Sequence, residues 1–510
     1  MLSSIFGKKS DHPMADIKST QALLDDLPKN DSHKTLMELT EWIESVSDNT
    51  DFKVDHQFAV LRLLDESAQL HARKLAREYF TPQELNKFHE NRLWLALGNF
   101  SRHSAKAYCG VFNRYCSGDK GGGAIKAQVP LLAARAVSAM NGQLKYICAR
   151  YGPIDNTIWD NLARLYQHAE QQQYLDTSFA LYSGVSENTS VKSEAGRLLG
   201  WYGFGVGALK PLYMHLTERI IARYCPAIGM NSQPNEGNLF SFDLSNPAAP
   251  RRVHIDATVH PSMRFVSMAG MRPKLEELIK SLQKKVVPED INLGGAYDAE
   301  LVRDAAKHLL GYLVAPPSRR SVRRGIKINM YVVSSFARVV ELTDVGLNFS
   351  NEKPVSLEIE DISANGFRMV LPAQGTDNIF IGSLLGVQPE GVKHWGVAVV
   401  RRLMRDDANR LHVGVEILAN QIAGVSISQS GGGGGGFEDG QPALWLEARQ
   451  GESTGETQLL MMKADTFSAN RSLITRLNEK SYLLIPSMLQ EKGSDYDLAS
   501  FRRIEQEKGS

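Results

Sequence analysis

The spacing of apolar positions divides the chain into a helical first part and a strand-rich second part. From about Ser32 to Cys225, apolar residues recur close to the 3.6-residue helical period, as Phe58 and Leu61 illustrate. After Pro316-Pro317, apolar and polar residues alternate and glycine-containing turns recur. We therefore expect a multidomain α+β protein: a mostly α-helical N-terminal region, an antiparallel β-barrel and a small β-rich C-terminal unit.

The helical domain is expected to span residues 31–315, after a mobile tail over residues 1–30 that contains a short helix. Thr81 before Pro82 predicts a helix start, because threonine caps helices and proline fits their first turn. Gly152-Pro153 predicts the end of a helix over 125–151. Further helices are predicted over 154–175, 188–224, 272–285 and 297–313. Residues 226–296 are less regular, with strand-like alternation at 239–244 and 252–256.

One helical segment has the residue spacing of a tetratricopeptide repeat, with Trp159, Leu162, Ala163 and Tyr166 at the positions of that repeat's first helix. No second copy follows at the repeat's period of about 34 residues. A single repeat cannot bury its apolar face by stacking. An ordinary helical bundle is therefore the preferred interpretation, and a degenerate repeat-like scaffold is the alternative.

Pro316-Pro317 ends the helical half, because proline cannot continue a helix. The pattern that follows predicts a small barrel over residues 318–425, with strands at 328–333, 336–342, 355–360, 366–371, 383–388, 394–403 and 410–418. Residues 426–442 include the run Gly431–Gly436, which has no side chains to pack and predicts a flexible linker. A second β-rich unit is expected over 443–505, with strands at 443–447, 458–462, 472–477 and 481–485.

Composition and charge limit the kinds of partner. The chain is 43% hydrophobic and its formal net charge is +1, so it can bury a core and has no global field for polyanions. The most apolar stretch, Leu198–Leu209, is shorter than the roughly 20 residues of a membrane-spanning helix. No secretory signal is recognisable at the start. The four cysteines are Cys109, Cys116, Cys148 and Cys225. They fit buried, reduced thiols, and we therefore expect a cytoplasmic protein.

A basic arm precedes the predicted barrel. The segment 319–327 reads Arg-Arg-Ser-Val-Arg-Arg-Gly-Ile-Lys and contains no acidic residue. A guanidinium group donates two parallel hydrogen bonds to phosphate, reads the O6 and N7 edge of guanine and stacks on bases. Such an arm suits a ligand with two phosphates and two guanines. Taken alone, it also fits a solvated basic linker.

A second motif, Asp361-x-Ser363-x-x-Gly366, falls where one strand should end and the next begin. Asp and Ser side chains bond to nearby backbone N–H groups in turns. Gly366 would permit a positive φ or a close approach of backbone. The Asp361 carboxylate could also accept hydrogen bonds from guanine, with help from the Ser363 hydroxyl. Taken alone, the motif also fits a capped hairpin turn.

Together the two motifs resemble the PilZ family of bacterial cyclic di-GMP receptors, which carry an R-x-x-x-R arm followed by D/N-x-S-x-x-G. Arg320 and Arg324 fit the arm, and Arg319 and Arg323 satisfy the same spacing in another register. Residues 397–403 and 411–418 resemble the family's closing hairpin. The gap from the arm to the second motif is longer than is usual in the family, which suggests an insertion at 336–353. The ligand-binding residues that the resemblance implies are Arg319, Arg320, Arg323, Arg324, Asp361, Ser363 and Gly366.

Other chemistry is not supported. The sequence has no nucleophile elbow, metalloprotease motif or dinucleotide-binding glycine motif, which leaves no residue on which to place catalysis. We expect a receptor and no enzyme activity. His254, Asp256 and His260 could share one face of a strand, but a straight strand separates the two histidines by roughly 20 Å. We expect no metal and no cofactor.

The resemblance therefore implies a cyclic di-GMP receptor or effector that couples ligand level to a protein partner through its helical region. A protein-interaction scaffold with a non-binding PilZ-like module is the alternative. A nucleic-acid binder that uses the basic arm is less favoured, because the whole chain is nearly neutral and only one short segment is basic.

Overall fold

The computed structural model describes residues 12–28, 30–184, 187–235, 237–253, 259–315, 324–343, 353–363, 365–372, 379–430, 440–447 and 456–506. The chain forms two compact units, Met1–Pro317 and Ser318–Ser510. The boundary falls at the predicted stop, Pro316-Pro317. The helical first part and the barrel-forming second part are both confirmed.

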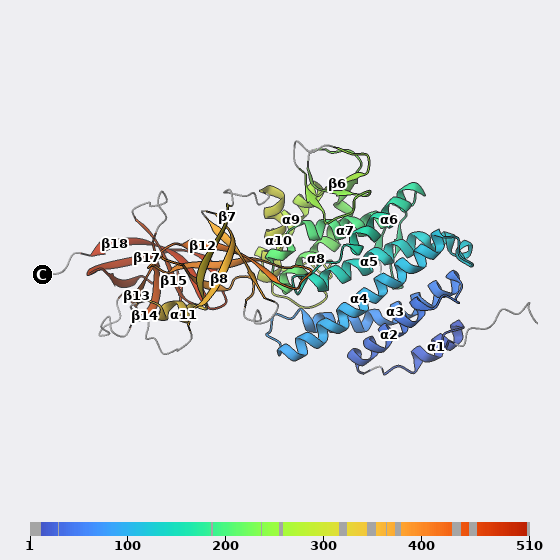
Figure 1. Cartoon of the computed structure of the whole chain (residues 1–510), viewed down its shortest axis with the longest axis horizontal. Coiled ribbons are helices and arrows are strands. Elements are labelled where there is room, and N and C mark those ends of the chain that lie inside the picture. The colour runs from blue at the N-terminus through green and yellow to red at the C-terminus, as the bar shows by residue number, and fades with distance from the viewer. Residues whose placement is uncertain are drawn as a thin grey trace, which may run out of the picture. The chain divides into compact units, whose positions relative to one another are not determined.

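The first unit is built mainly from helices that enclose one large apolar core. The long helices α2, α3, α4 and α5 run side by side, as Figure 1 shows. Ala-rich faces let α4 and α5 approach closely, and Gly142 of α5 lies against Ser101 of α4. The helices are α1 (Ile17–Asp25), α2 (Ser32–Asp48), α3 (Val54–Tyr79), α4 (Lys87–Cys116), α5 (Val129–Cys148), α6 (Thr157–Gln171), α7 (Val191–Gly203), α8 (Pro211–Tyr224), α9 (Arg272–Gln283) and α10 (Ala299–Val314).

A small antiparallel sheet in the first unit has the strand order β3-β6-β4-β5. Strand β4 (Asn238–Asp243) confirms the alternation predicted at 239–244, because Phe240 and Phe242 turn into the core. The other strands are β3 (Gly229–Asn231), β5 (Arg251–Arg252) and β6 (Met263–Ser267), and β1 (Phe179–Ala180) pairs separately with β2 (Asn188–Thr189).

Three expectations for this unit differ from the structure. The short helix expected within residues 1–30 is α1, but residues 12–28 are not a loose tail, since Met14 is buried and its carbonyl bonds with the His56 ring at 2.9 Å. The helix expected at Pro82 begins at Lys87 instead, because Asn86 accepts from the Phe88 N–H and so provides the cap. The repeat-like residues of α6 are all buried, so their spacing reflects the packing of one helix against the core.

The second unit contains two closed barrels. The first has the order β10-β11-β12-β9-β8-β7 and the second β13-β14-β15-β18-β17-β16. The first barrel comprises β7 (Arg324–Ser334), β8 (Val355–Ser363), β9 (Gly366–Leu371), β10 (Leu384–Pro389), β11 (Gly396–Arg405) and β12 (Leu411–Ala419). The second comprises β13 (Ile422–Gln429), β14 (Gln441–Leu446), β15 (Thr457–Lys463), β16 (Leu473–Leu477), β17 (Lys480–Lys492) and β18 (Tyr496–Gln506).

The segment predicted as a strand at 336–342 is instead the helix α11 (Phe336–Glu341). Its apolar residues Phe336, Val339 and Val340 have helical spacing and are buried on one face. Aromatic Phe336 and the β-branched Val339 and Val340 also have high strand propensity, which favoured the strand prediction. The adjoining residues 344–352, where part of an inserted hairpin was expected, lie outside the described residues.

The glycine run does not separate the two barrels. Strand β13 occupies residues 422–429, which overlap the predicted linker at 426–442, and pairs antiparallel with β14. The run therefore joins two neighbouring strands of the second barrel. The barrels meet after Ala419, where β12 ends and only two residues precede β13.

The two barrels share an apolar core. Val397 and Val399 of the first barrel pack with Leu444 and Leu446 of the second, and α11 contributes to the same cluster. Across this contact Arg401 donates to both oxygens of Glu491, at 2.7 and 2.6 Å. The predicted picture of a tethered second β-unit is therefore wrong, because burial of apolar surface fixes the two barrels together.

Among the described helices, none has a long enough apolar stretch to span a membrane. The four cysteines are free thiols, as expected, and Cys109, Cys148 and Cys225 are buried. Cys116 differs from the expectation, since it is exposed at the end of α4.

Candidate functional site

The Asp-x-Ser-x-x-Gly motif forms the tight turn between β8 and β9. Ser363 pairs with Gly366 at the end of the ladder, and Ile362 pairs with Phe367. The Ser363 hydroxyl donates to the Gly366 carbonyl at 3.0 Å and closes the turn. Phe367 points into the barrel, where it is fully buried. The alternation of β9 therefore anchors the turn from inside and leaves its polar residues on the outer face.

Gly366 is needed because backbone approaches closely. A Cβ atom at this position would collide with the carbonyl oxygen of Val415 on β12. Gly366 does not have a positive φ. Of the two roles that the sequence left open for this glycine, the structure selects close packing of β9 against β12.

A β-bulge brings two carboxylates together beside the turn. Ile359 pairs with Met369 and Asp361 with Arg368, so the intervening Glu360 is an extra residue on β8. The Arg368 guanidinium bridges both acids, with an Nη atom 2.7 Å from Glu360 Oε2 and Nε 3.2 Å from Asp361 Oδ2. The bulge thus holds Asp361 on the outer face in a fixed orientation.

The basic arm begins beside this same turn. Arg324, the first residue of β7, pairs with Ile362, and Gly325 pairs with Asp361. A second irregularity in the ladder, between Gly325 and Ile328, separates this short pairing from the regular part of β7. Arg324 is exposed. The structure brings Arg324 to the Asp361–Gly366 turn, although 37 positions separate Arg324 from Asp361 in the sequence.

The other predicted arm residues, Arg319, Arg320 and Arg323, lie outside the described residues. Their attachment point is nevertheless defined, since Arg324 follows directly.

Sequence reasoning missed Arg368 and Glu360. Arg368 lies one position after the inward-facing Phe367, so alternation alone predicts that it faces outward. A two-residue turn between Ser363 and Gly366 would then have paired it near Asp361. The bulge at Glu360 has no such sequence signal, because it depends on how β8 fits β9.

In the described part of the chain, no group of three or more His, Cys, Asp and Glu side chains is arranged to hold a metal ion. His254 and Asp256 of the weighed metal candidate lie outside the described residues. His260 Nδ1 instead bonds with the Ser262 hydroxyl at 2.6 Å.

Two family models match the chain. Residues 18–233 match the model described as the N-terminal domain of the cyclic-di-GMP receptor FimW. Residues 347–423 match the model described as the middle PilZ domain of the same receptor. No curated protein matches significantly. The PilZ match covers β8 to β12 and includes the Asp361–Gly366 turn, whereas β7 and the basic arm precede it.

Proposed function

Because this chain belongs to the PilZ-containing FimW family of cyclic-di-GMP receptors, we propose that its first barrel binds the ligand between the basic arm and the Asp361–Gly366 turn. The observation that best supports this proposal is the pairing of Arg324 with Ile362. This pairing supports a site in which the arm and the turn act on one ligand, since they are adjacent on the barrel surface.

The chemistry of the two sides is complementary. The arginines Arg319, Arg320 and Arg323, with Arg324, supply planar donors for the two phosphates and flat faces for stacking on guanine. On the other side, the Asp361 carboxylate is an acceptor for guanine N–H groups. A carboxylate has about four lone-pair sites, so it can accept from guanine as well as from Arg368.

Three side chains of the turn have distinct proposed roles. Asp361 would contact the base directly, and the Ser363 hydroxyl would assist it. In the structure this hydroxyl donates to the Gly366 carbonyl, so its oxygen retains acceptor capacity for a ligand donor. Gly366 would act indirectly, by letting β9 approach β12 and so fixing the turn's position.

Ligand binding would act as a switch. The arm connects the end of α10 to β7, so ordering it on a ligand would change the link between the helical unit and the barrel. Such a shift requires that the ligand bind one arrangement more tightly than the other. The helical unit would present this change to a protein partner. The free thiols are compatible with function in the reducing cytoplasm.

Calorimetric titration of the full chain with cyclic di-GMP tests the binding site. We expect saturable binding at micromolar ligand, and a loss of affinity of at least about tenfold in Arg320→Ala and Arg324→Ala. Arg476→Ala is the matched control, because Arg476 is an exposed arginine on β16 of the second barrel. Absence of binding heat in the wild type would refute the binding site. Equal losses of affinity in all three variants would refute the role of the basic arm in ligand binding.

Capture of partners from a bacterial lysate with and without cyclic di-GMP tests the coupling. A partner that depends on both the ligand and Arg320 supports the switch. A partner set indifferent to ligand, together with absent binding, would favour the alternative of a scaffold with a non-binding module. Duplex DNA that displaces cyclic di-GMP with steep salt dependence would favour the nucleic-acid alternative.

A further inference from the structure

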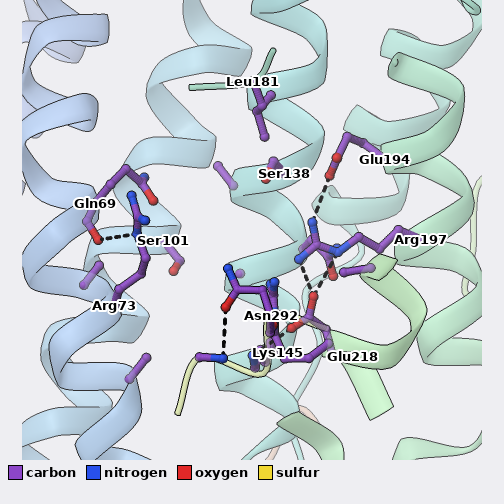
Figure 2. A pocket seen from close by; sticks show the side chains of 18 of the residues that line it. Gln69, Arg73, Ser101, Ser138, Lys145, Leu181, Glu194, Arg197, Glu218 and Asn292 are labelled. Carbon is purple, nitrogen blue, oxygen red and sulfur yellow. Dashed lines mark hydrogen bonds and ion pairs between the residues drawn. The ribbon is translucent and has the colours of Figure 1, made fainter. Parts of the chain in front are cut away.

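A pocket lined by both polar and apolar residues lies within the helical unit, far from the motifs of the first barrel along the chain. Its volume is about 550 Å³, within the usual range for small-molecule sites. Figure 2 shows Gln69 and Arg73 of α3 on one side and Glu194, Arg197 and Glu218 of α7 and α8 on the other. Lys145 of α5 and the loop residue Asn292 lie between them.

Part of the lining is an internally satisfied charge cluster. Lys145 Nζ donates to Glu218 at 2.9 Å and to His215 Nδ1 at 2.8 Å. Arg197 also pairs with Glu218 and with Glu194. Burial lowers the pKa of His215 well below its usual value, so the ring is neutral and its Nε2–H donates to the Leu293 carbonyl. This cluster holds the wall together and is not available as the principal binding group.

Three further arginines line the same pocket in a different way. Each uses its Nε–H on a backbone carbonyl: Arg73 on Gln69 at 3.2 Å, Arg77 on Gly294 at 2.9 Å and Arg219 on Asn292 at 2.6 Å. In the structure as described, none of the three forms an ion pair with a carboxylate. Their guanidinium planes are therefore oriented by backbone carbonyls, and their Nη groups are not engaged in a direct ion pair among the described residues.

The three arginines lie on two sides of the pocket, Arg73 and Arg77 on α3 and Arg219 on α8, and the loop 292–294 connects the two sides. Arg73 and Arg77 are one turn apart on α3 and so occupy the same face of that helix. Arg77 and Arg219 both hold the loop 292–294, from opposite helices. The whole lining contains six cationic and four acidic side chains, a surplus of two positive charges. Burial lowers the pKa of Arg219, and this effect outweighs the attraction of Glu218.

A second, independent feature also indicates a ligand. Asn141 of α5 lines the pocket and is only 3% exposed, yet neither Oδ1 nor Nδ2 has a hydrogen-bond partner among the described residues. The Ser104 hydroxyl of α4, 2% exposed, lines the same pocket and likewise has none. Buried polar groups are rarely left in this state, because each costs about 1–3 kcal/mol. An amide offers one donor side and one acceptor side, which match a donor–acceptor edge on a ligand.

We propose that this pocket binds a phosphate ester of nucleoside monophosphate size, with its phosphate on Arg73, Arg77 and Arg219 and its polar body on Asn141 and Ser104. Guanidinium groups match phosphate through paired parallel hydrogen bonds. This second ligand is distinct from the cyclic dinucleotide of the barrel. The helical unit is thus a ligand-binding domain in its own right.

The test is calorimetric titration of the full chain, first saturated with cyclic di-GMP, using AMP, GMP and ribose 5-phosphate as probes and adenosine as the phosphate-free comparison. We expect at least one phosphate ester to bind, and adenosine to bind at least about tenfold more weakly than AMP. Arg73→Gln and Arg219→Gln should each weaken binding at least about tenfold. The nearly isosteric Asn141→Asp should also weaken it, because a carboxylate cannot donate the hydrogen bond that the amide offers to the polar body of the ligand.

Arg272→Gln is the matched control, because Arg272 is an exposed arginine on α9 that does not line the pocket. Its affinity for the probes should be unchanged. Asp361→Asn, which lies in the barrel, should also leave probe binding intact, and this separates the pocket from the cyclic di-GMP site. Failure of all three phosphate esters to bind would overturn the proposal and indicate a pocket filled by water. Equal effects of Arg272→Gln and Arg219→Gln, or tight binding of adenosine, would overturn the assignment of the arginines to phosphate.

Discussion

Two neighbouring carboxylates allow a sharp test of the cyclic di-GMP site. Asp361 and Glu360 lie on the same β-bulge and both pair with Arg368. Only Asp361 belongs to the motif that is proposed to contact guanine. Asp361→Asn and Glu360→Gln each remove one negative charge while almost preserving side-chain shape. The pair therefore separates a contact with the ligand from a general effect of charge or stability.

The expected magnitudes follow from exposure. Arg368 is 41% exposed and its two partners are 38% and 17% exposed, so losing either ion pair should cost less than about 1 kcal/mol of folding free energy. A hydrogen bond between a carboxylate and guanine N–H groups contributes about 1.5–3 kcal/mol. Asp361→Asn should therefore weaken cyclic di-GMP binding about 10- to 100-fold, and Glu360→Gln less than about threefold.

Calorimetric titration at fixed ionic strength measures both affinities, and urea denaturation measures both stabilities. The prediction requires that the two variants be almost equally stable and differ in affinity by about tenfold or more. Equal affinities in the two variants would refute the assignment of Asp361 to guanine. A loss of affinity in Asp361→Asn that is accompanied by unfolding of the barrel would show that its role is structural.

Three further predictions concern stability and are measured by urea denaturation. Gly366→Ala should destabilise the first barrel by about 1–3 kcal/mol, because its methyl group would collide with the Val415 carbonyl. Gly325→Ala is the control and should cost far less, because a methyl group there meets no atom within 4 Å. Equal losses of stability in the two variants would contradict this reasoning. Leu444→Ala should lower the free energy of unfolding of both barrels by about 2–5 kcal/mol, since Leu444 is fully buried in their shared core. A loss of stability confined to the second barrel would argue against that shared core. His215 has a depressed pKa in the folded state, so the unfolded state binds the extra proton and stability should fall as pH drops below about 6.5, by up to about 1.4 kcal/mol per unit from this group. His215→Gln should reduce that slope by one proton, and an unchanged slope would contradict the burial of a neutral ring.

Several features of the chain could be predicted from the sequence because they depend on neighbouring residues. Alternation of apolar and polar residues predicted the strands β8 to β12, and the tight turn Asp361–Gly366 was correctly located between β8 and β9. Pro316-Pro317 predicted the boundary between the two units, since proline cannot continue a helix beyond its first turn. The resemblance to PilZ receptors rested on this short, contiguous motif and on the arm before it, and the family models bear it out.

Other features were decided by contacts between distant segments. The helix α11 became identifiable only once the second barrel supplied the apolar surface that buries it, and the strand β13 only once β14 supplied its pairing partner. Arg368 acquired its role through a bulge, which reflects the fit of two strands and leaves no periodic signal. The pocket of the helical unit gathers Arg73, Asn141 and Arg219 from three separate helices. Periodicity reports which face of an element is buried, whereas the partner that buries it, and the polar groups that then meet, are determined only by the assembled tertiary structure.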